Sequence, residues 1–399
     1  MKIVIAPDSF KESLSAMQVA EAIEQGLKQV FPDADYRKVP MADGGEGTVQ
    51  AMVDATGGEI IHLNVRGPLG NAIPSFYGIL GATTSGTKTA VIEMAAASGL
   101  HLVARNERNP LITSSYGTGE LIIDALNRGI RHIIIGLGGS ATNDAGAGML
   151  KALGFSLLNH VGTAIDDGGA GLIDLATIDD TQCHPHLKDC QFDIACDVDN
   201  PLCGPKGASA IFGPQKGATS EMVTQLDGAL NHFAKIAHPH WNNDRLHHLP
   251  GAGAAGGMGF AIVAFLKGQL SPGVTLVANA VGLADTCKGA TLVITGEGRI
   301  DGQTVFGKTP MGVLQTAQQY HVPVIGIAGC LGDNADAMIK QGMTAIFPII
   351  PGIATLDQVL SQAAINLTNT SANIAALMKL SMSLNHDISG DKNLKQAKP

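Results

Sequence analysis

The chain has 399 residues, with 26 lysines and arginines against 35 aspartates and glutamates, which gives a formal net charge of −9. Hydrophobic residues make up 45% of the chain and aromatic residues only 4%, while glycine occurs 50 times. This composition excludes a disordered chain, and it excludes a nucleic-acid binder that relies on clustered basic residues. The length exceeds what a single hydrophobic core usually supports, so we expect two domains.

The sequence predicts neither a membrane span nor a secretory signal. Its longest apolar runs, such as residues 274–284, fall short of the ~18–20 residues that a bilayer requires. Only four apolar residues separate Lys2 from Pro7, which is too few for a signal peptide. Six cysteines are too few for a disulfide scaffold, and the spacing of four of them matches no zinc knuckle. We therefore expect free thiols and a cytoplasmic location.

The first sixty residues predict alternating strands and helices. Residues 2–6 form an apolar strand, and apolar positions at helical spacing follow Ser15, which is a plausible N-cap. A second strand at residues 36–39 leads into a glycine-rich loop and a helix that ends near Thr56. Alternation of this kind is typical of a parallel sheet.

The pattern then changes to three strands without helices between them, at residues 59–66, 72–80 and 88–94. Glycine, proline and asparagine turns separate these strands, so they predict an antiparallel meander. Helix–strand alternation returns afterwards. We expect helices at residues 121–126, 144–153 and 258–266, and strands at 131–136, 192–198, 291–295, 322–328 and 345–349.

These elements predict the α/β class with two α/β domains. One would be Rossmann-like, discontinuous and mainly parallel, formed by residues 1–58, 113–154 and 285–383. The other would be a mixed domain with the meander, formed by residues 59–112 and 155–284, and residues 384–399 would be a loose tail. Ligands of such sheets bind at the carboxyl ends of the strands, so we expect the active site in the interdomain cleft.

Two loops near the N-terminus are candidates for the site. Asp8 follows the first strand, where it either serves the site or only starts a turn. In residues 42–48, Asp43, Gly44 and Gly45 let backbone N–H groups approach a ligand, and a helix starting at Glu46 would add its positive dipole end. The alternative is an ordinary Asp-Gly turn before an acidic first helical turn.

A third loop, residues 136–146, joins an apolar strand to a helix rich in glycine and alanine. Backbone donors with the Ser140 and Thr142 hydroxyls would cradle a phosphate or carboxylate, unless the glycines serve only close packing. The loop also fits the dinucleotide fingerprint formally, but no acidic residue ends a strand ~20 residues later. A glycine run at residues 251–257 would let a helix N-terminus meet either a ligand or a neighbouring segment closely.

Two further loops carry charged residues. Residues 196–202 place Asp197, Asp199 and Asn200 after a strand, which suits Mg²⁺ but also suits an Asx-turn before proline. Residues 302–309 satisfy the Walker A pattern. We do not interpret them as a P-loop, because they begin several residues after the predicted strand and Pro310 predicts a late helix start. A long loop that brings Arg299 and Lys308 to an anion remains the favoured interpretation.

Taken together, glycine-rich anion cradles, separated carboxylates and a few cations indicate phosphoryl transfer. This chemistry depends on positioning and charge neutralisation more than on a covalent nucleophile. The sequence contains no pattern typical of a Ser-His or Cys-His catalytic pair. A carboxylate would hold Mg²⁺ or accept the proton of the substrate hydroxyl.

The loops also resemble, in order and over nearly the whole chain, those of the type-1 bacterial glycerate kinases. The motifs are KIVIAPDSFKESLSA at 2–16, ADGGEGT at 42–48, GLGGSATND at 136–144, CDVDNPL at 196–202, FGPQKGA at 212–218, GAGAAGG at 251–257, GEGRID at 296–301 and GKTP at 307–310. The resemblance implies a cytoplasmic kinase that uses ATP and Mg²⁺ to phosphorylate D-glycerate. It favours the 2-hydroxyl, although other members are assigned the 3-phosphate as product.

On this resemblance we expect the following roles. The catalytic residues would be Asp8, Asp43, Asp197 and Lys308, with the aspartates holding Mg²⁺ (Asp43 and Asp197 foremost) or accepting the proton. Arg299 would hold the glycerate carboxylate, assisted by Lys11, Glu297 and Asp301. The phosphates of ATP would bind to Gly44, Gly45, Gly138, Gly139, Ser140, Thr142, Asn143 and Lys216.

Two other classes of protein stay open at this point. One is a nicotinamide-dependent oxidoreductase acting on a hydroxy acid, and the other is a hydroxy-acid binding protein without catalytic activity. We expect small-molecule partners only, with neither nucleic acid nor membrane, and the sequence leaves the oligomeric state open.

Overall fold

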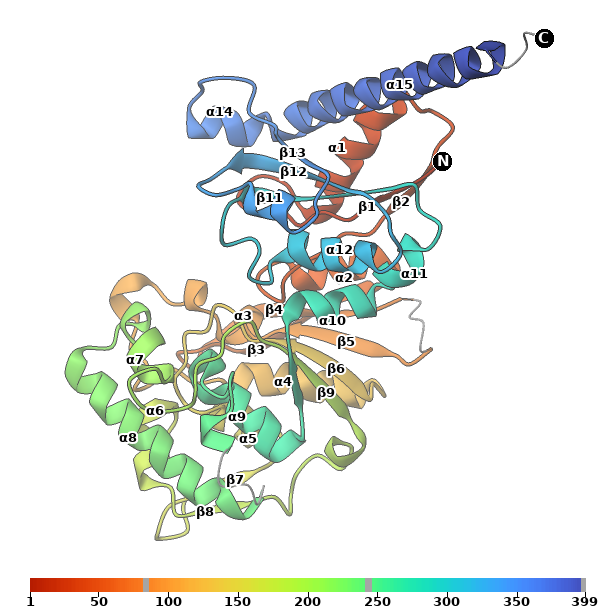
Figure 1. Cartoon of the computed structure of the whole chain (residues 1–399). Coiled ribbons are helices and arrows are strands. Elements are labelled where there is room, and N and C mark those ends of the chain that lie inside the picture. The colour runs from red at the N-terminus through yellow and green to blue at the C-terminus, as the bar shows by residue number, and fades with distance from the viewer. Residues whose placement is uncertain (82–85, 241–245, 396–399) are drawn as a thin grey trace. The chain divides into compact units, whose positions relative to one another are not determined.

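In a computed structural model, the chain forms two compact units, Met1–Ala42 with Gly282–Pro399 and Asp43–Val281 (Figure 1). The structure describes residues 1–81, 86–240 and 246–395, with side chains up to residue 384. We call the discontinuous unit the first unit and the continuous one the second unit. Both are α/β, as predicted.

The first unit is built on a fully parallel sheet of five strands, in the order β13-β12-β11-β1-β2. In chain order this is 2-1-3-4-5, the flavodoxin-like arrangement of a doubly wound sheet. Parallel strands must be joined by crossover connections, usually helices that run back along a face of the sheet. This explains the regular alternation of strands and helices in the sequence. The strands are β1 (Lys2–Ile5), β2 (Asp35–Lys38), β11 (Leu292–Ile300), β12 (Val324–Leu331) and β13 (Ala345–Pro348).

Helix α1 (Ala16–Lys28) begins where the sequence predicts. Ser15 is its N-cap: the hydroxyl accepts the N–H of Gln18, and the Gln18 side chain accepts the N–H of Ser15. A Cβ on Gly26 would lie 2.2 Å from the carbonyl oxygen of Thr368, so glycine is what lets α1 pack closely against α15 (Ala363–Lys395). The other helices of this unit are α11 (Leu283–Cys287), α12 (Thr309–Gln318), α13 (Ala337–Lys340) and α14 (Leu356–Ser361).

The second unit contains a mixed sheet of six strands, in the order β10-β9-β6-β5-β4-β3. The predicted meander is confirmed, because β3 pairs with β4 and β4 with β5 in antiparallel fashion. The β5–β6, β6–β9 and β9–β10 pairs are parallel. The strands are β3 (Glu59–Arg66), β4 (Ala72–Ile79), β5 (Thr89–Glu93), β6 (His132–Gly136), β9 (Gln191–Ala195) and β10 (Gln269–Ser271), and β7 (Ser156–Leu158) pairs separately with β8 (Thr177–Asp179).

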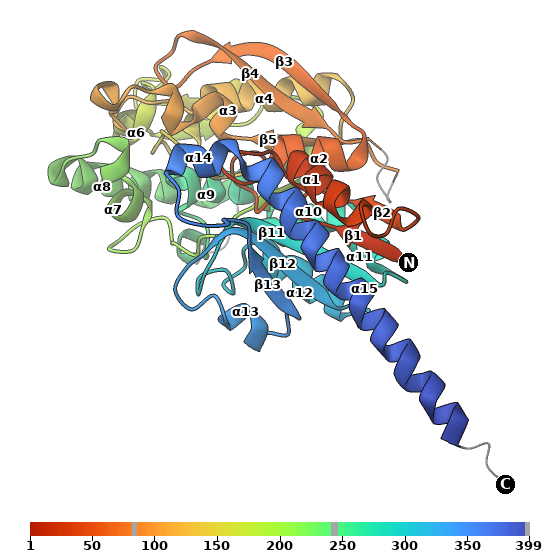
Figure 2. The same ribbon diagram turned by 90° about the horizontal axis from the view of Figure 1, so that it is seen from above.

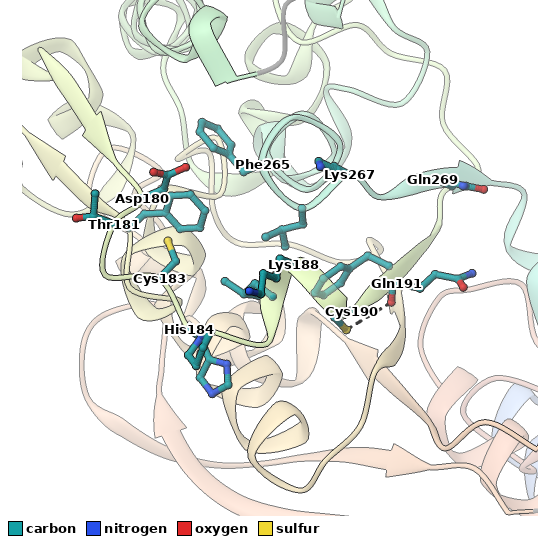
Figure 3. Close-up of a pocket in the computed structure, with 15 residues that line it drawn as sticks. Asp180, Thr181, Cys183, His184, Lys188, Cys190, Gln191, Phe265, Lys267 and Gln269 are labelled. Carbon is teal, nitrogen blue, oxygen red and sulfur yellow. Dashed lines mark hydrogen bonds between the residues drawn. The ribbon is translucent and has the colours of Figure 1, made fainter.

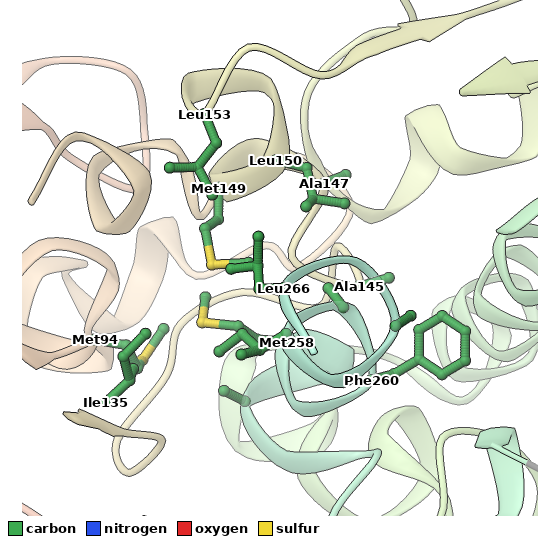
Figure 4. Close-up of a cluster of buried hydrophobic side chains, with 14 of the residues drawn as sticks. Met94, Ile135, Ala145, Ala147, Met149, Leu150, Leu153, Met258, Phe260 and Leu266 are labelled. Atoms are coloured by element: carbon green, nitrogen blue, oxygen red, sulfur yellow. The ribbon is translucent and has the colours of Figure 1, made fainter. Parts of the chain in front are cut away.

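Aliphatic residues and methionines fill most of the core of the second unit. Figure 4 shows Met149 on α5 and Met258 on α9 among buried side chains that include Met94, Leu150 and Leu266. A flexible thioether fills irregular space well, which suits a chain with few aromatic residues. The helices of this unit are α2 (Thr48–Thr56), α3 (Ala95–Ser98), α4 (Tyr116–Asn127), α5 (Ala147–Ala152), α6 (Gly168–Gly171), α7 (Ala208–Phe212), α8 (Ser220–Ala237), α9 (Ala254–Leu266) and α10 (Gly273–Ala280).

The boundaries of the units differ from the predicted domains. Residues 43–58 and 113–154 were assigned to the Rossmann-like domain, but β6 lies between β5 and β9 in the sheet of the second unit. An apolar parallel strand carries no local signal for the sheet that it joins, because both of its faces are buried in either one. Residues 282–284, assigned to the second domain, belong to the first unit.

The C-terminal segment also differs from the prediction. Residues 384–395 form the last turns of α15, which extends away from the rest of the first unit (Figure 2), while residues 396–399 lie outside the described part. The first half of α15 is anchored by buried Leu367, Ile374 and Ala375. Among the described residues, no helix has both the length and the apolar character needed to cross a bilayer.

Candidate active site

In the first unit, the predicted residues gather at the carboxyl ends of β1 and β11. These neighbouring strands flank the point where the strand order reverses, which is where doubly wound sheets bind ligands. Asp8 follows β1, and its N–H donates to the carbonyl oxygen of Gly296 at 2.8 Å. Strand β11 continues to Ile300, five residues beyond the predicted end at Thr295, so Glu297 and Arg299 lie on the strand itself. Being two residues apart, they share one face of it.

The Asp8 carboxylate is held on both oxygens. Oδ1 accepts the N–H of Ser9 at 2.6 Å, and Oδ2 accepts the hydroxyl of Thr309 at 2.6 Å. Thr309 is fully buried and is the first residue of α12, so this hydrogen bond ties the loop after β1 to the start of α12. Sequence reasoning missed Thr309 because its partner is 301 positions away in the chain.

Asp301 lies between the two cations predicted for the site. Its Oδ2 is 3.3 Å from Nε of Arg299, and its Oδ1 is 3.8 Å from Nζ of Lys308. The Arg299 side chain is 60% exposed and therefore accessible to a solute, and Lys11 is exposed as well. The arrangement presents cationic groups with an internal counter-charge, which suits reversible binding of an organic anion.

Glu297 is a carboxyl group of this cluster whose pKa is strongly perturbed. Burial raises its pKa from the usual 4.5 to about 7, and the charges of Asp8 and Asp301 act in the same direction. A hydrogen bond from the Thr304 hydroxyl to Oε1 (2.7 Å) and the charge of Lys308 oppose this shift. A carboxyl group with a pKa near neutrality can both accept and release a proton at physiological pH.

The Walker-like segment is explained by the structure. Because β11 ends at Ile300, the loop does begin directly after its strand, and one of our two reasons for rejecting a P-loop was wrong. The other holds: α12 begins at Thr309, with Lys308 as its N-cap and Pro310 in its first turn. In a P-loop the Ser/Thr hydroxyl binds Mg²⁺, whereas here the Thr309 hydroxyl donates to Asp8.

In the second unit, the predicted loops meet at the carboxyl ends of β6, β9 and β10. A Cβ on Gly136 would lie 2.4 Å from the carbonyl oxygen of Gly44, and one on Gly273 would lie 1.8 Å from that of Asp43. Gly44 itself has a φ of +92° and faces Ala195. These contacts require glycine, so the loop of Asp43, Gly44 and Gly45 lies directly on the strand ends.

Asp43 and Asp197 form a pair of carboxylates on these loops. Oδ1 of Asp43 accepts the N–H of Gly45 (3.0 Å), and Oδ1 of Asp197 accepts the N–H of Gly273 (2.9 Å). Neither Oδ2 has a hydrogen-bond partner in the part of the chain that the structure describes. Asp197 is exposed as a residue, but its carboxylate packs on the start of α10; this partial burial, together with the charge of Asp43, raises its pKa.

A cation would relieve the repulsion between these two carboxylates, and two carboxylates with open oxygens fit Mg²⁺, which takes few protein ligands and keeps several waters. Within the described ranges, no three or more His, Cys, Asp or Glu side chains are placed to hold a metal. The remaining ligands would therefore have to come from water and from a substrate phosphate.

The third predicted loop divides into an exposed and a buried half. Gly138 and Gly139 are exposed, and the N–H groups of Gly138, Gly139 and Ser140 have no acceptor among the described residues. Three consecutive free donors make a nest for an anion. Thr142 and Asn143 have no exposed surface, and Lys216 is 1% exposed, so these three residues lie behind the loop rather than on it.

The glycine run at residues 251–257 meets a neighbouring segment. Ala255, Gly256 and Gly257 have positive φ angles at the start of α9, and a Cβ on Gly256 would lie 2.1 Å from the carbonyl oxygen of Thr142. The N–H of Ala145 donates to the carbonyl oxygen of Gly256 at 3.0 Å. Of the two alternatives, close packing against a neighbouring segment, residues 142–145, is the one that the structure supports.

Glu93, at the end of β5, is a residue that sequence reasoning missed. Its buried carboxylate accepts the N–H of Val49 at 2.8 Å and interacts with the backbone of Gly47 and Thr48. Burial raises its pKa, while these hydrogen bonds oppose the shift. The start of α2, which is at Thr48 rather than Glu46, is thus already occupied by an anionic side chain, so its dipole is not free for a ligand. The sequence did offer one signal for this residue, because Glu93 is a single acidic residue within the apolar run 90–94.

A separate pocket of about 500 Å³ lies at the amino ends of β9 and β10, away from the predicted loops at their carboxyl ends (Figure 3). Its lining includes Cys183, Lys188, Gln191, Phe265 and Gln269, at the amino ends of β9 and β10. Asp197 and Gly273 follow the carboxyl ends of these two strands. None of the residues predicted for the site lines this pocket.

Comparison with known proteins identifies the family. The model of the glycerate kinase family matches residues 3–379. The chain belongs to the glycerate kinase family. It is therefore a kinase, as the motifs predict, and the oxidoreductase and binding-protein alternatives are no longer favoured.

Individual relatives are similar over nearly their whole length. A glycerate kinase of Haemophilus influenzae is 54% identical over 95% of this chain and 99% of its own. A protein of Escherichia coli K12 named glycerate 2-kinase is 52% identical over 96% of this chain and 99% of its own. A crystal structure from Salmonella typhimurium LT2, described provisionally as glycerate kinase 2, matches with a TM-score of 0.88 at 52% identity, covering 96% of this chain and 99% of that one.

Proposed function

We propose that the protein transfers the γ-phosphoryl group of ATP to the 2-hydroxyl of D-glycerate, giving 2-phosphoglycerate and ADP. Membership of the glycerate kinase family carries the proposal. The 2-position is favoured because a relative with 52% identity over 96% of this chain is named a glycerate 2-kinase.

We assign binding of the hydroxy acid to the first unit. Arg299 is exposed, and its planar guanidinium matches a carboxylate in two parallel hydrogen bonds. On binding, the substrate carboxylate would replace part of the contact between Arg299 and Asp301. Lys308 and Lys11 would neutralise further negative charge, and Asp301 would keep the two cations apart when no substrate is bound.

Glu297 is the best-suited acceptor for the hydroxyl proton. As the bond between the substrate oxygen and phosphorus forms, the O–H proton passes to the Glu297 carboxylate, and the bond to the β,γ-bridging oxygen breaks with its electron pair leaving on ADP. Asp8 has both oxygens engaged by Ser9 and Thr309, so we assign it to holding the loop after β1 in place.

The second unit would bind the phosphates. The N–H groups of Gly138, Gly139 and Ser140 would donate to phosphate oxygens, and Gly44 and Gly45 hold the Asp43 loop against the strand ends. Asp43 and Asp197 would hold Mg²⁺, which when bound neutralises phosphate charge as phosphoryl transfer proceeds. Thr142 and Asn143 would support the loop from behind, because they are fully buried.

A ³¹P NMR spectrum of the purified protein with Mg-ATP and D-glycerate tests this function. We expect ADP together with the phosphomonoester signal of a secondary alcohol, which identifies 2-phosphoglycerate. A primary phosphomonoester would retain the kinase and overturn the assigned position. A folded protein that forms no phosphomonoester would refute the substrate assignment.

A further inference from the structure

Lys216 is buried directly behind the loop of residues 138–142. It is the last residue of a short 3₁₀ turn, Pro214–Lys216, and only 1% of its surface is exposed. Its Nζ donates to the Ser140 hydroxyl at 2.8 Å and to the carbonyl oxygen of Thr142 at 2.6 Å. The side chain therefore bridges two positions of the loop.

The protein gives this buried amine no ion-pair partner among the described residues. The negative charge of Asp144 favours the protonated amine, but the oxygens of Asp144 already accept hydrogen bonds from Ser115, Gly146 and Gly148. Burial lowers the pKa of Lys216 to about 7. A buried lysine is costly to retain, and simple structural needs are met more cheaply by an apolar residue.

The loop depends on outside support for its shape. Its backbone is held on one side, where the N–H of Leu100 donates to the carbonyl oxygen of Gly139 (2.7 Å) and the N–H of Ala141 donates to that of Ser98 (2.9 Å). Two buried polar atoms at its end, Oγ1 of Thr142 and Oδ1 of the following Asn143, have no hydrogen-bond partner in the described part of the chain. Lys216 adds bonds to the Ser140 hydroxyl and to the carbonyl oxygen of Thr142.

We propose that Lys216 is a positioning residue that holds the N–H groups of Gly138, Gly139 and Ser140 toward a nucleotide phosphate and takes up a proton when that phosphate binds. The inference rests on the proposed function only in naming the ligand as a nucleotide. An anion on the loop stabilises the charged ammonium behind it, so the bound state favours the protonated amine. The free protein favours the neutral amine above neutral pH.

The sign of the pH dependence follows from this linkage. Above pH 7 the free amine is mainly neutral, so binding requires proton uptake and affinity falls as pH rises, by at most tenfold for each pH unit. Two charged groups lie near Lys216: Asp144, and Arg108, which donates to the carbonyl oxygen of Gln215. The titratable His101 lies beside Gly99, whose neighbours Ser98 and Leu100 bond to the loop. At pH 8–9 phosphate groups are fully ionised, because their second pKa is about 6, so the nucleotide adds little to the slope.

Calorimetric titration of the whole protein with ADP at pH 8, in two buffers with different heats of ionisation, measures proton uptake directly. We expect net uptake by the wild type and none by Lys216→Met. The exposed Lys235→Met on α8 is the matched control and should retain the wild-type uptake. Binding without proton uptake by the wild type would overturn the proposal, and this arm needs no variant to fold.

Steady-state kinetics separate positioning from a general loss of structure. Lys216→Met should raise the KM for ATP by about tenfold or more and leave the KM for glycerate within about twofold, while Lys216→Arg should recover only part of the loss. Equal increases in the KM for ATP and the KM for glycerate would refute a role specific to the loop of residues 138–142. Proton-linked ADP binding in a protein that fails to phosphorylate glycerate would support this inference and refute the proposed function.

Discussion

Replacing Glu297 by glutamine tests the electrostatics of the first unit. The amide keeps an oxygen that can accept the Thr304 hydroxyl, so packing is preserved and only the titratable proton is removed. In the wild type, the pKa of Glu297 is raised by burial, by Asp8 and by Asp301. An acid with a raised pKa in the folded state destabilises the fold once pH is high enough to ionise it in the unfolded chain.

The size of the effect follows from the shift. The pKa of Glu297 rises from 4.5 to about 7, and at 1.36 kcal/mol for each pKa unit this is about 3 kcal/mol. Below pH 4.5 the carboxyl group is protonated in both states and contributes nothing. Between pH 4.5 and 7 the free energy of unfolding of the wild type falls progressively by this amount, and above pH 7 the decrease stays constant. Glutamine does not ionise, so the variant does not lose this stability. The free energies of unfolding of the wild type and of Glu297→Gln should therefore diverge by about 3 kcal/mol between pH 4.5 and 8.

Urea denaturation of both proteins at pH 4.5, 6 and 8 checks the divergence. Glu21→Gln, an exposed change on α1 of the same unit, is the control and should run parallel to the wild type. The same Glu297 variant should lose turnover by about 10²–10⁴-fold, the usual contribution of a general base. It should also lose the rise in kcat/KM that we expect for the wild type as pH passes through about 7. Parallel stability curves for the wild type and Glu297→Gln would refute the reasoning about burial.

Three further changes have definite expected outcomes. Asp197→Asn should lower kcat by about 10²-fold or more and weaken the Mg²⁺ dependence while leaving the Tm nearly unchanged, and a near-normal kcat would remove Asp197 from the site. Arg299→Ala should raise the KM for glycerate by about tenfold, as loss of a charge-assisted hydrogen bond predicts, with the KM for ATP unaffected; equal effects would contradict the assignment. Gly256→Ala should reduce the free energy of unfolding by about 2–3 kcal/mol in urea denaturation, because the new Cβ lies 2.1 Å from the carbonyl oxygen of Thr142 and φ is +69°. Gly57→Ala has a similar φ of +65° but open space, so a loss as large as that of Gly256→Ala would show that the clash contributes nothing.

Local features of the fold were predictable because they depend on neighbouring residues. Ser15 and Gln18 specify the start of α1 through a capping box four residues long, and the meander strands carry their own turn signals. The family resemblance was predictable for the same reason, since each motif is a contiguous stretch of sequence. The family match then confirmed it.

Long-range pairing was not predictable from the sequence. The assignment of β6 to the wrong domain shows that an apolar strand does not specify its neighbours. The bond between Asp8 and Thr309 joins residues 301 positions apart, and nothing near either residue indicates it. The family resemblance placed Lys216 on a phosphate, and only the packing shows that its side chain is buried and bonded to Ser140 and Thr142.

The order of strands in the first unit also constrains how the chain is made. Strand β1 needs β11 as its second neighbour, yet all of residues 43–281 are synthesised between them. On the ribosome, the pair β1–β2 must therefore wait with one edge unpaired while the second unit, which is continuous in sequence, completes its own folding. An unpaired apolar edge is a template for aggregation. Slowing translation after residue 281 should thus lower the soluble yield of the whole protein.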